Sequence, residues 1–385
     1  MAEENAIQPD IPKVYEGRFP PDYQNRVMYW GFFPREDIEA NKGRLLMLDV
    51  DLGRECSLAC PTCYRRLSVI DDSGGKDLTY DELTGVIGDA VRDQPLQSVK
   101  VCGAGEPLED VRFLRFVREM DSMGIGVNAF IKGNVLGSDE WTEAVYGREY
   151  GISSAMQLAE ELAKYRLSFN LCCQSFRPEV QNAMVGRDWY ASLRNKAMVN
   201  LAKAGFNRGN PTRLCLANAP VTRQNIDDAF GIYVYARERN MYPCIAVPMT
   251  SGKQLTPEFI DRIDIPHERK IQLWVEAYSW NIDHGISTIK QLRMDGVSCM
   301  PGGHVCNQNA AGVYITANGN VVRCPGFTEV EGNVRNESIG DIWERVGKEF
   351  AGTFNCGCPP KEDTTIPVIL YDDVLIELEK RYGGR

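Results

Sequence analysis

The chain has 385 residues, 43% of them hydrophobic and 25% charged, which is typical of a folded protein with one large domain and a smaller one. Its formal charge of −10 argues against nucleic acid as a partner, and no apolar run approaches the ~20 residues that cross a bilayer. Because the first residues also lack a signal peptide, we expect a cytoplasmic protein that binds neither nucleic acid nor membrane.

From residue 44 onward, short apolar segments alternate with longer amphipathic ones, a pattern typical of βα units around a parallel sheet. The predicted strands cover residues 45–50, 98–102, 126–131, 168–173, 213–217 and 244–247. The predicted helices cover residues 78–92, 110–123, 154–165, 189–204 and 225–239, with one or two more within 255–279. Six such units predict an α/β fold, a partial (β/α)6 barrel of the TIM type, whose functional groups gather at the carboxyl ends of the strands.

Composition divides the chain into four parts. Residues 1–43 are rich in proline and aromatic residues and show no sustained period, so we expect an irregular N-terminal arm. The barrel follows in residues 44–252, and residues 253–298 form a helical connection. Residues 299–385 are rich in glycine and cysteine, which predicts a small C-terminal module with a tail.

Thirteen cysteines are many for a cytoplasmic protein, where clustered thiols indicate metal or redox chemistry. Cys56, Cys60 and Cys63 have the spacing C-x3-C-x2-C directly after the first predicted strand. Three thiolates on one loop can hold three irons of a cubane cluster and leave the fourth iron open to an external molecule. The alternative is a zinc site completed by a distant ligand, although zinc loops usually contain C-x2-C pairs.

Five further cysteines lie in apolar runs and are expected to be small buried hydrophobes: Cys102, Cys172, Cys173, Cys215 and Cys244.

The cysteine loop is followed at once by Tyr64 and resembles the signature of the radical S-adenosylmethionine (radical SAM) superfamily, in which an aromatic residue follows the last cysteine. One βα unit later comes a turn that is similar to the G-G-E-P motif of these enzymes, formed by Gly103, Ala104, Gly105, Glu106 and Pro107. The resemblance implies that this turn, with Tyr64, binds the methionine end of S-adenosylmethionine. Small residues let the backbone approach the ligand, and a carboxylate accepts charge-assisted hydrogen bonds from its ammonium group.

Two later segments are similar to other cofactor contacts of the superfamily. Residues 174–179 and 184–187 resemble its S-L-D-S-x-x-P-E … R-G segment, which implies that Ser175 contacts the cofactor and that Arg187 pairs with a carboxylate. Gln174 stands where aspartate is common, and a solvated arginine is an equal alternative for Arg187. Residues 221–225 resemble the V-T-x-x-N segment, or form an ordinary helix cap at Thr222.

The C-terminal module is predicted to contain a β-hairpin over residues 312–323 with a turn at Asn318-Gly319. Cys306 and Cys324 bracket this hairpin in a spacing that resembles the SPASM auxiliary-cluster module, called twitch when shortened. A full module has seven or eight cysteines for two clusters, whereas this segment has five: Cys299, Cys306, Cys324, Cys356 and Cys358.

Because one cubane takes four thiolates, the resemblance implies one auxiliary [4Fe–4S] cluster. Its ligands are expected to be Cys306, Cys324 and two of Cys299, Cys356 and Cys358. A zinc ribbon is the alternative, since four thiolates also suit zinc.

The resemblance implies an enzyme with S-adenosylmethionine, a three-cysteine [4Fe–4S] cluster and a reductant such as flavodoxin or ferredoxin. Reductive cleavage of the cofactor gives a 5′-deoxyadenosyl radical that abstracts hydrogen from the substrate. One auxiliary cluster, and an N-terminal arm too short for a winged-helix leader-binding domain, favour oxidation of a small molecule such as an alcohol, sugar or cyclitol.

The alternatives are modification of a peptide or protein, epimerisation with a cysteine as hydrogen donor, and a non-enzymatic electron carrier. No catalytic residue can be read from the sequence. The polar candidates for the pocket are Tyr64, Glu179, Arg213 and His304, each of which is equally explained as structural.

Overall fold

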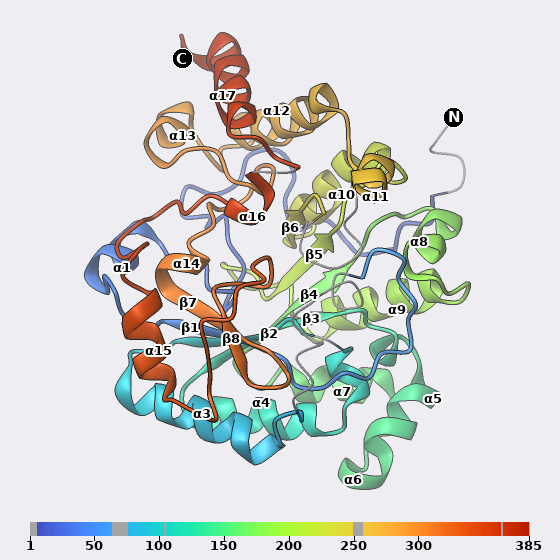
Figure 1. The fold of residues 1–385 in the computed structure, drawn as a ribbon. Helices are drawn as coiled ribbons and strands as arrows, with labels where there is room; N and C mark the ends of the chain where they lie inside the picture. The colour runs from blue at the N-terminus through green and yellow to red at the C-terminus, as the bar shows by residue number, and fades with distance from the viewer. Residues whose placement is uncertain (1–5, 64–75, 104, 249–256, 363–364, 385) are drawn as a thin grey trace.

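The computed structural model describes residues 6–63, 76–103, 105–248, 257–362 and 365–384 (Figure 1). Its described strands form one nine-stranded sheet in the order β6-β5-β4-β3-β2-β1-β7-β8-β9. The first six strands are all parallel: β1 (Met47–Val50), β2 (Ser98–Val101), β3 (Gly126–Ile131), β4 (Leu167–Cys172), β5 (Leu214–Asn218) and β6 (Tyr242–Ile245). They confirm the predicted partial barrel and lie within two residues of the predicted strands.

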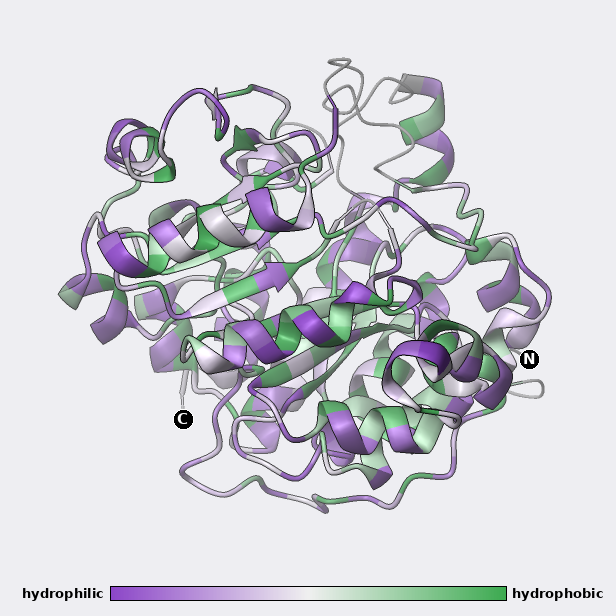
Figure 2. Cartoon of the chain, turned by 90° about the horizontal axis from the view of Figure 1, so that it is seen from below, coloured by the Kyte–Doolittle hydropathy of each residue, from purple (hydrophilic) through white to green (hydrophobic). Residues whose placement is uncertain are grey.

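The helices that connect these strands lie around the outside of the sheet (Figure 1). They are α3 (Tyr80–Asp93), α4 (Arg112–Ser122), α7 (Ala155–Leu162), α8 (Pro178–Val185), α9 (Tyr190–Lys203) and α10 (Ile226–Glu238). Shorter helical segments are α1 (Arg35–Ala40), η2 (Pro107–Glu109), η3 (Val135–Gly137), α5 (Asp139–Thr142), η4 (Glu143–Gly147) and α6 (Arg148–Tyr150). Figure 2 shows hydrophilic and hydrophobic residues side by side on individual helices, as expected for helices that cover one face of a sheet.

The C-terminal part is mostly helical. It contains α11 (Pro257–Ile263), α12 (His267–Asp283), α13 (Ile289–Asp295), α14 (Gln308–Ala311), α15 (Ile339–Val346), α16 (Pro359–Glu362) and α17 (Ile369–Tyr382). None of the helices in the described ranges is long and apolar enough to cross a membrane.

The predicted hairpin is present and continues the barrel sheet beyond β1. Strand β7 (Gly312–Ile315) pairs in parallel with β1, from Met47 opposite Gly312 to Val50 opposite Ile315. Strand β8 (Asn320–Val322) returns antiparallel after Gly319, whose φ of +85° suits the turn, and β9 (Gly332–Asn333) pairs with β8. The sheet therefore runs without a break from the barrel into the C-terminal segment.

The barrel strands alternate apolar side chains that pack on the helices with polar ones that face inward. Val99 and Val101 of β2 belong to the core that includes Leu83 of α3. Between them Lys100 is in register with Asp49 of β1 and Asn128 of β3. Because side chains in neighbouring register positions share a face of the sheet, Asp49, Lys100 and Asn128 form a polar row on the inner face of β1 to β3. Closed TIM barrels fill this space with branched apolar residues instead.

The N-terminal arm packs against the barrel and reaches its interior. Val27 forms a β-bridge with Thr212, and the backbone oxygen of Met28 accepts a hydrogen bond from the Ser168 hydroxyl. Trp30 and Phe32 then pack with Tyr242 of β6 in a second hydrophobic cluster. The arm thereby brings two aromatic side chains to the site described next.

Candidate functional site

A cavity of about 550 Å³ lies at the carboxyl ends of the barrel strands, within the ~300–1,000 Å³ range of small-molecule sites. Both predicted cysteine sets line it. Cys56, Cys60 and Cys63 contribute from the loop after β1, and the C-terminal segment contributes Cys299, Cys306, Cys324 and Cys358.

The loop of the first cysteine set is held by side chains from neighbouring turns. The carboxylate of Glu109, in η2, accepts hydrogen bonds from the Ser57 backbone N–H (2.9 Å), the Ser57 hydroxyl (2.6 Å) and the Asn134 amide (2.7 Å). Arg187 donates from Nε to the Ser57 backbone oxygen (2.8 Å). Arg187 therefore positions the cysteine loop, and this contact is with a carbonyl rather than with the carboxylate expected from the sequence.

Burial raises the pKa of the Cys56 thiol to about 12 and also raises that of Cys60. Such thiols become ligands when a bound cation displaces their protons. The chemistry of this donor set therefore fits an iron–sulfur cluster that is bound as the thiols deprotonate.

The turn after β2 runs directly beside the cysteine loop. A Cβ atom on Gly103 would overlap the Asp51 carboxylate, and one on Gly105 would overlap the backbone oxygen of Glu55, so both positions require glycine. The Glu106 N–H donates to the same Glu55 oxygen (2.7 Å). Gly103, Gly105 and Glu106 line the main cavity, whereas Tyr64 and Ala104 lie outside the described residues.

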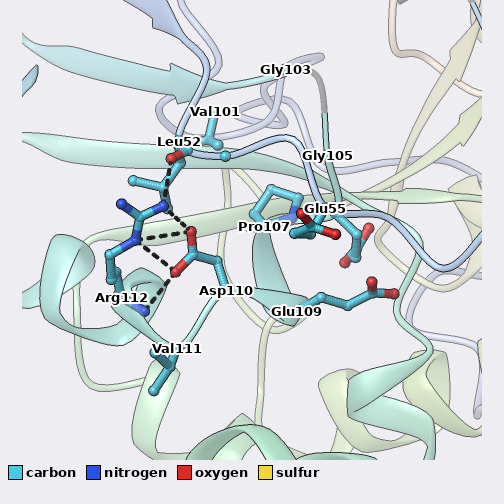
Figure 3. Close-up of a pocket in the computed structure, with 12 residues that line it drawn as sticks. Leu52, Glu55, Val101, Gly103, Gly105, Pro107, Glu109, Asp110, Val111 and Arg112 are labelled. Atoms are coloured by element: carbon cyan, nitrogen blue, oxygen red, sulfur yellow. Dashed lines mark hydrogen bonds and ion pairs between the residues drawn. The ribbon is translucent and has the colours of Figure 1, made fainter. Parts of the chain in front are cut away.

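The same turn, including Pro107, also borders a second cavity of about 300 Å³ (Figure 3). There the Arg112 guanidinium donates to Asp110 and to the backbone oxygen of Leu52, which follows β1. This clamp fixes the η2 turn relative to the start of the cysteine loop.

Glu106 is a buried carboxylate with one free oxygen. It is 2% exposed, and its Oε2 accepts from the Lys132 backbone N–H (2.6 Å). Its Oε1 has no hydrogen-bond partner among the residues that the structure describes. Burial raises the pKa of Glu106 to about 8. An ammonium group in the cavity would satisfy this oxygen, so the site fits the amino group of S-adenosylmethionine.

The raised pKa of Glu106 predicts a pH dependence of stability. In the cofactor-free protein the folded state keeps the proton up to about pH 8, whereas the unfolded chain loses it near pH 4.5. Stability should therefore fall by about 1.4 kcal/mol per pH unit between these values. Urea unfolding at pH 5, 6, 7 and 8 should show this fall in the wild type relative to Glu106→Gln. An equal change of the unfolding free energy with pH in the two proteins would contradict the prediction.

Lys132, at the end of β3, is a cavity-lining residue that the sequence analysis missed. Burial opposes its charge, but Cys172, Cys60 and Glu106 more than offset this effect and raise the pKa of Lys132. It stays cationic and can pair with a carboxylate in the cavity.

Ser175 is fully buried behind the cavity wall. Its hydroxyl donates to Asp228 of α10 (2.6 Å) and accepts from the Arg177 N–H (2.9 Å). The neighbouring Gln174 lines the cavity instead. The geometry thus gives Ser175 a role in joining β4 to α10, and Ser175 is not among the residues that line the cavity.

Residues 221–225 also hydrogen-bond to residues at the ends of neighbouring strands. The Asn225 amide donates to the backbone oxygen of Gln174 (3.0 Å) and to Asn218 (3.0 Å), and its oxygen accepts from the Thr222 N–H (2.7 Å). Helix α10 begins after Asn225. This favours the structural interpretation of the segment, with Asn225 rather than Thr222 at the cap position.

Of the five C-terminal cysteines, four line the cavity and Cys356 does not. The Cys299 thiol shares hydrogen bonds with Cys306 and Cys358, and a hydrogen bond from Cys299 lowers the pKa of Cys306 to about 7. Cys324 lines the same wall. The Cys356 thiol points instead to the backbone oxygen of Thr353 (3.6 Å). No group of described side chains is closed around a point that would hold a single metal ion. The four thiols instead share one wall of the cavity.

Of the five cysteines that lie in apolar runs, four are buried as expected: Cys172, Cys173, Cys215 and Cys244. Cys102 is only partly buried, which corrects the expectation for this residue. Cys102, Cys172 and Cys244 also line the cavity, because they lie in or next to the ends of barrel strands.

Three candidate pocket residues lie elsewhere. His304 stacks on Phe32 (ring centroids 5.3 Å apart), and Arg213 donates to the backbone oxygens of Tyr165 and Ala163. Glu179 is exposed in the first turn of α8. The structure therefore gives these side chains other surroundings than the cavity.

The floor of the cavity is polar, which the sequence analysis also missed. The Ser168 hydroxyl donates to the Met28 backbone oxygen and so accepts from the Asn128 amide. The Asn128 oxygen therefore accepts from the Asn170 amide, which leaves Asn170 Oδ1 as an acceptor without a hydrogen-bond partner in the described ranges. On the other side, Gln308 Oε1 accepts from Lys100, and the Gln308 side chain also hydrogen-bonds to the Asp49 carboxylate.

The chain is similar to known proteins both in sequence and in fold. No protein-family model matches the sequence. The chain is 23% identical over 319 residues to the "Tungsten-containing aldehyde ferredoxin oxidoreductase cofactor-modifying protein" of Pyrococcus furiosus, covering 77% of this chain and 80% of that protein.

Among solved structures, Streptococcus suis SuiB bound to the precursor peptide SuiA matches with a TM-score of 0.54 and 13% identity, over 78% of this chain and 65% of that one. SuiB bound to S-adenosylmethionine matches with a TM-score of 0.51 and 14% identity, over 82% and 69%. The chain thus spans about two thirds of SuiB, and at this identity the likeness shows the shared fold.

Proposed function

We propose that this chain, which has the fold of the radical SAM enzymes, is itself a radical SAM enzyme that oxidises a small polar molecule. One observation carries the proposal: both cysteine sets line a single cavity. Three thiols leave one iron of a cubane cluster without a protein ligand, and four thiols close a second cluster. This is the arrangement that the proposed reaction needs.

The residues around the first set suit the cofactor. Bound S-adenosylmethionine supplies, on one-electron reduction, a 5′-deoxyadenosyl radical that abstracts hydrogen from the substrate. Glu106 Oε1 would accept a hydrogen bond from the amino group of the cofactor, and the Lys132 ammonium would pair with its carboxylate. Gly103 and Gly105 let the backbone approach it. SuiB, which shares the fold of this chain, has been solved with S-adenosylmethionine bound.

The cavity floor suits a small hydroxyl-bearing substrate, such as an alcohol, sugar or cyclitol. A substrate hydroxyl group can donate to Asn170 Oδ1, which satisfies a buried acceptor. The aromatic rings of Trp30, Phe32 and Phe130 form an apolar wall that excludes water. A flavodoxin or ferredoxin in the cytoplasm is the proposed reductant.

A second candidate is modification of a larger partner. Two similar proteins favour it, since SuiB has been solved with a precursor peptide and the Pyrococcus protein is described as modifying the cofactor of a tungsten enzyme. Epimerisation is a further variant, for which Cys102, Cys172 or Cys244 is placed to give a hydrogen atom. Deuterium from solvent in the product, without net oxidation, would select epimerisation.

Anaerobic reconstitution with iron and sulfide tests the proposal. The wild type should bind about eight irons per chain and form 5′-deoxyadenosine from S-adenosylmethionine under dithionite. Cys60→Ser should abolish this product, whereas Cys173→Ser, a buried cysteine in the core, should keep it. If the wild type binds only about four irons per chain, the protein has no auxiliary cluster. If the iron-loaded protein forms no 5′-deoxyadenosine, the proposed radical SAM activity is wrong.

A further inference from the structure

Lys100 places a buried positive charge on the inner face of the barrel. It lies in the middle of β2, is 7% exposed, and its Nζ pairs with the Asp49 carboxylate of β1 at 2.9 Å. The same ammonium donates to Gln308 Oε1 (2.9 Å). Burial opposes the charge of Lys100, but Asp49 offsets this effect and raises the pKa of the lysine. A charge buried at this depth is costly unless it is paired.

Gln308 connects this charge to the auxiliary thiols. It is the first residue of α14 and lies two positions after Cys306. Its backbone N–H donates to the Cys306 sulfur, while its side chain holds Lys100. Lys100, Gln308 and Cys306 line the same cavity. The ammonium and the sulfur therefore share one hydrogen-bonded unit.

We propose that Lys100 raises the reduction potential of the cluster held by Cys299, Cys306, Cys324 and Cys358, and so makes that cluster a better electron acceptor. This rests on the proposed function, because it requires a cluster at these thiols. Reduction adds a negative charge, and a fixed positive charge nearby favours the reduced form more strongly in a low-dielectric interior than in water. Local charge and hydrogen bonds are the protein's main means of setting such potentials.

The alternative is that Lys100 only neutralises Asp49. Removing either charge alone leaves the other unpaired, so Lys100→Met should lower the midpoint potential and Asp49→Asn should raise it. The double variant Lys100→Met/Asp49→Asn separates the two hypotheses. If the positive charge of Lys100 outweighs the negative charge of Asp49 at the cluster, the double variant should have a lower midpoint than the wild type, whereas a lysine that only neutralises Asp49 predicts an unchanged midpoint.

The experiment is a redox titration of the full-length reconstituted protein at pH 7, followed by electron paramagnetic resonance. A Cys56→Ala/Cys60→Ala/Cys63→Ala variant identifies the auxiliary signal, and Lys164→Met is the matched control, because it removes a lysine paired with Glu161 on the exposed surface. We expect a more negative midpoint for Lys100→Met and for the double variant, a more positive one for Asp49→Asn, and no shift for Lys164→Met.

Each outcome separates the inference from the proposed function. Full iron content in the variants, with an unchanged midpoint in the double variant, would overturn the role of Lys100 and leave the function intact. About four irons in the wild type would overturn the auxiliary cluster itself. If Lys100→Met does not retain the auxiliary iron, the double variant decides: a lower midpoint supports the inference, and an unchanged one overturns it.

Discussion

Replacing Cys358 by serine is expected to remove about four of the about eight irons that the reconstituted protein binds, whereas replacing Cys356 by serine should leave the iron content unchanged. Cys358 lines the cavity and shares a hydrogen bond with Cys299. The Cys356 sulfur points to the Thr353 backbone oxygen instead. A serine hydroxyl is a poor ligand where soft thiolates are preferred, so only the loss of a true ligand should matter.

The two variants are closely matched, because they change the same residue type two positions apart. Iron and acid-labile sulfide should be measured per chain, together with 5′-deoxyadenosine formation. Both variants should retain cofactor cleavage, since the first cysteine set is untouched. Equal iron loss in the two variants would contradict the ligand set that the structure indicates.

The sequence alone could not distinguish Cys358 from Cys356 as the ligand, for a local geometric reason. In an extended Cys-x-Cys segment both side chains lie on the same face, which made Cys356 and Cys358 equivalent candidates. Gly357 between them has a φ of +62°, in the left-handed region that favours glycine. The chain therefore turns at Gly357, and the two thiols have different surroundings. The glycine was visible in the sequence, but its turn was not.

Replacing Glu109 by alanine is expected to reduce iron affinity at the first cysteine set, or the rate of 5′-deoxyadenosine formation, by about 10–100-fold, the usual cost of losing a partner that orients metal ligands. Three hydrogen bonds end on this carboxylate, two of them from Ser57 between Cys56 and Cys60. Without it the Ser57 N–H is left unsatisfied and the loop loses its anchor.

Glu179→Ala is the control for this variant, because Glu179 is an exposed glutamate that does not line the cavity. Iron should be titrated into the metal-free protein, and cleavage should be followed at saturating S-adenosylmethionine. Wild-type values for both quantities in Glu109→Ala would show that the loop does not depend on this carboxylate.

The barrel was predictable because its strands and helices follow local patterns, and the cysteine loop was predictable because its spacing is a contiguous motif. The polar interior was missed although its signal was present. Ser98, Lys100 and Cys102 alternate with two valines, and this period of two places the polar residues on one face. The segment was interpreted only as an apolar run. The contacts of Glu109 and Lys100 depend on residues far apart in the chain, so no local pattern could indicate them.

The pairing of β7 with β1 has a consequence for biosynthesis. Strand β1 leaves the ribosome early, but its second neighbour begins only at Gly312. At about 5–20 residues per second this delay is on the order of tens of seconds, during which one edge of β1 stays open. The nine-stranded sheet therefore cannot be completed before most of the chain has been translated, although the six barrel strands end at Ile245. Under the proposed function, the auxiliary cluster can form only after Cys358 has emerged, when this edge of β1 is already paired.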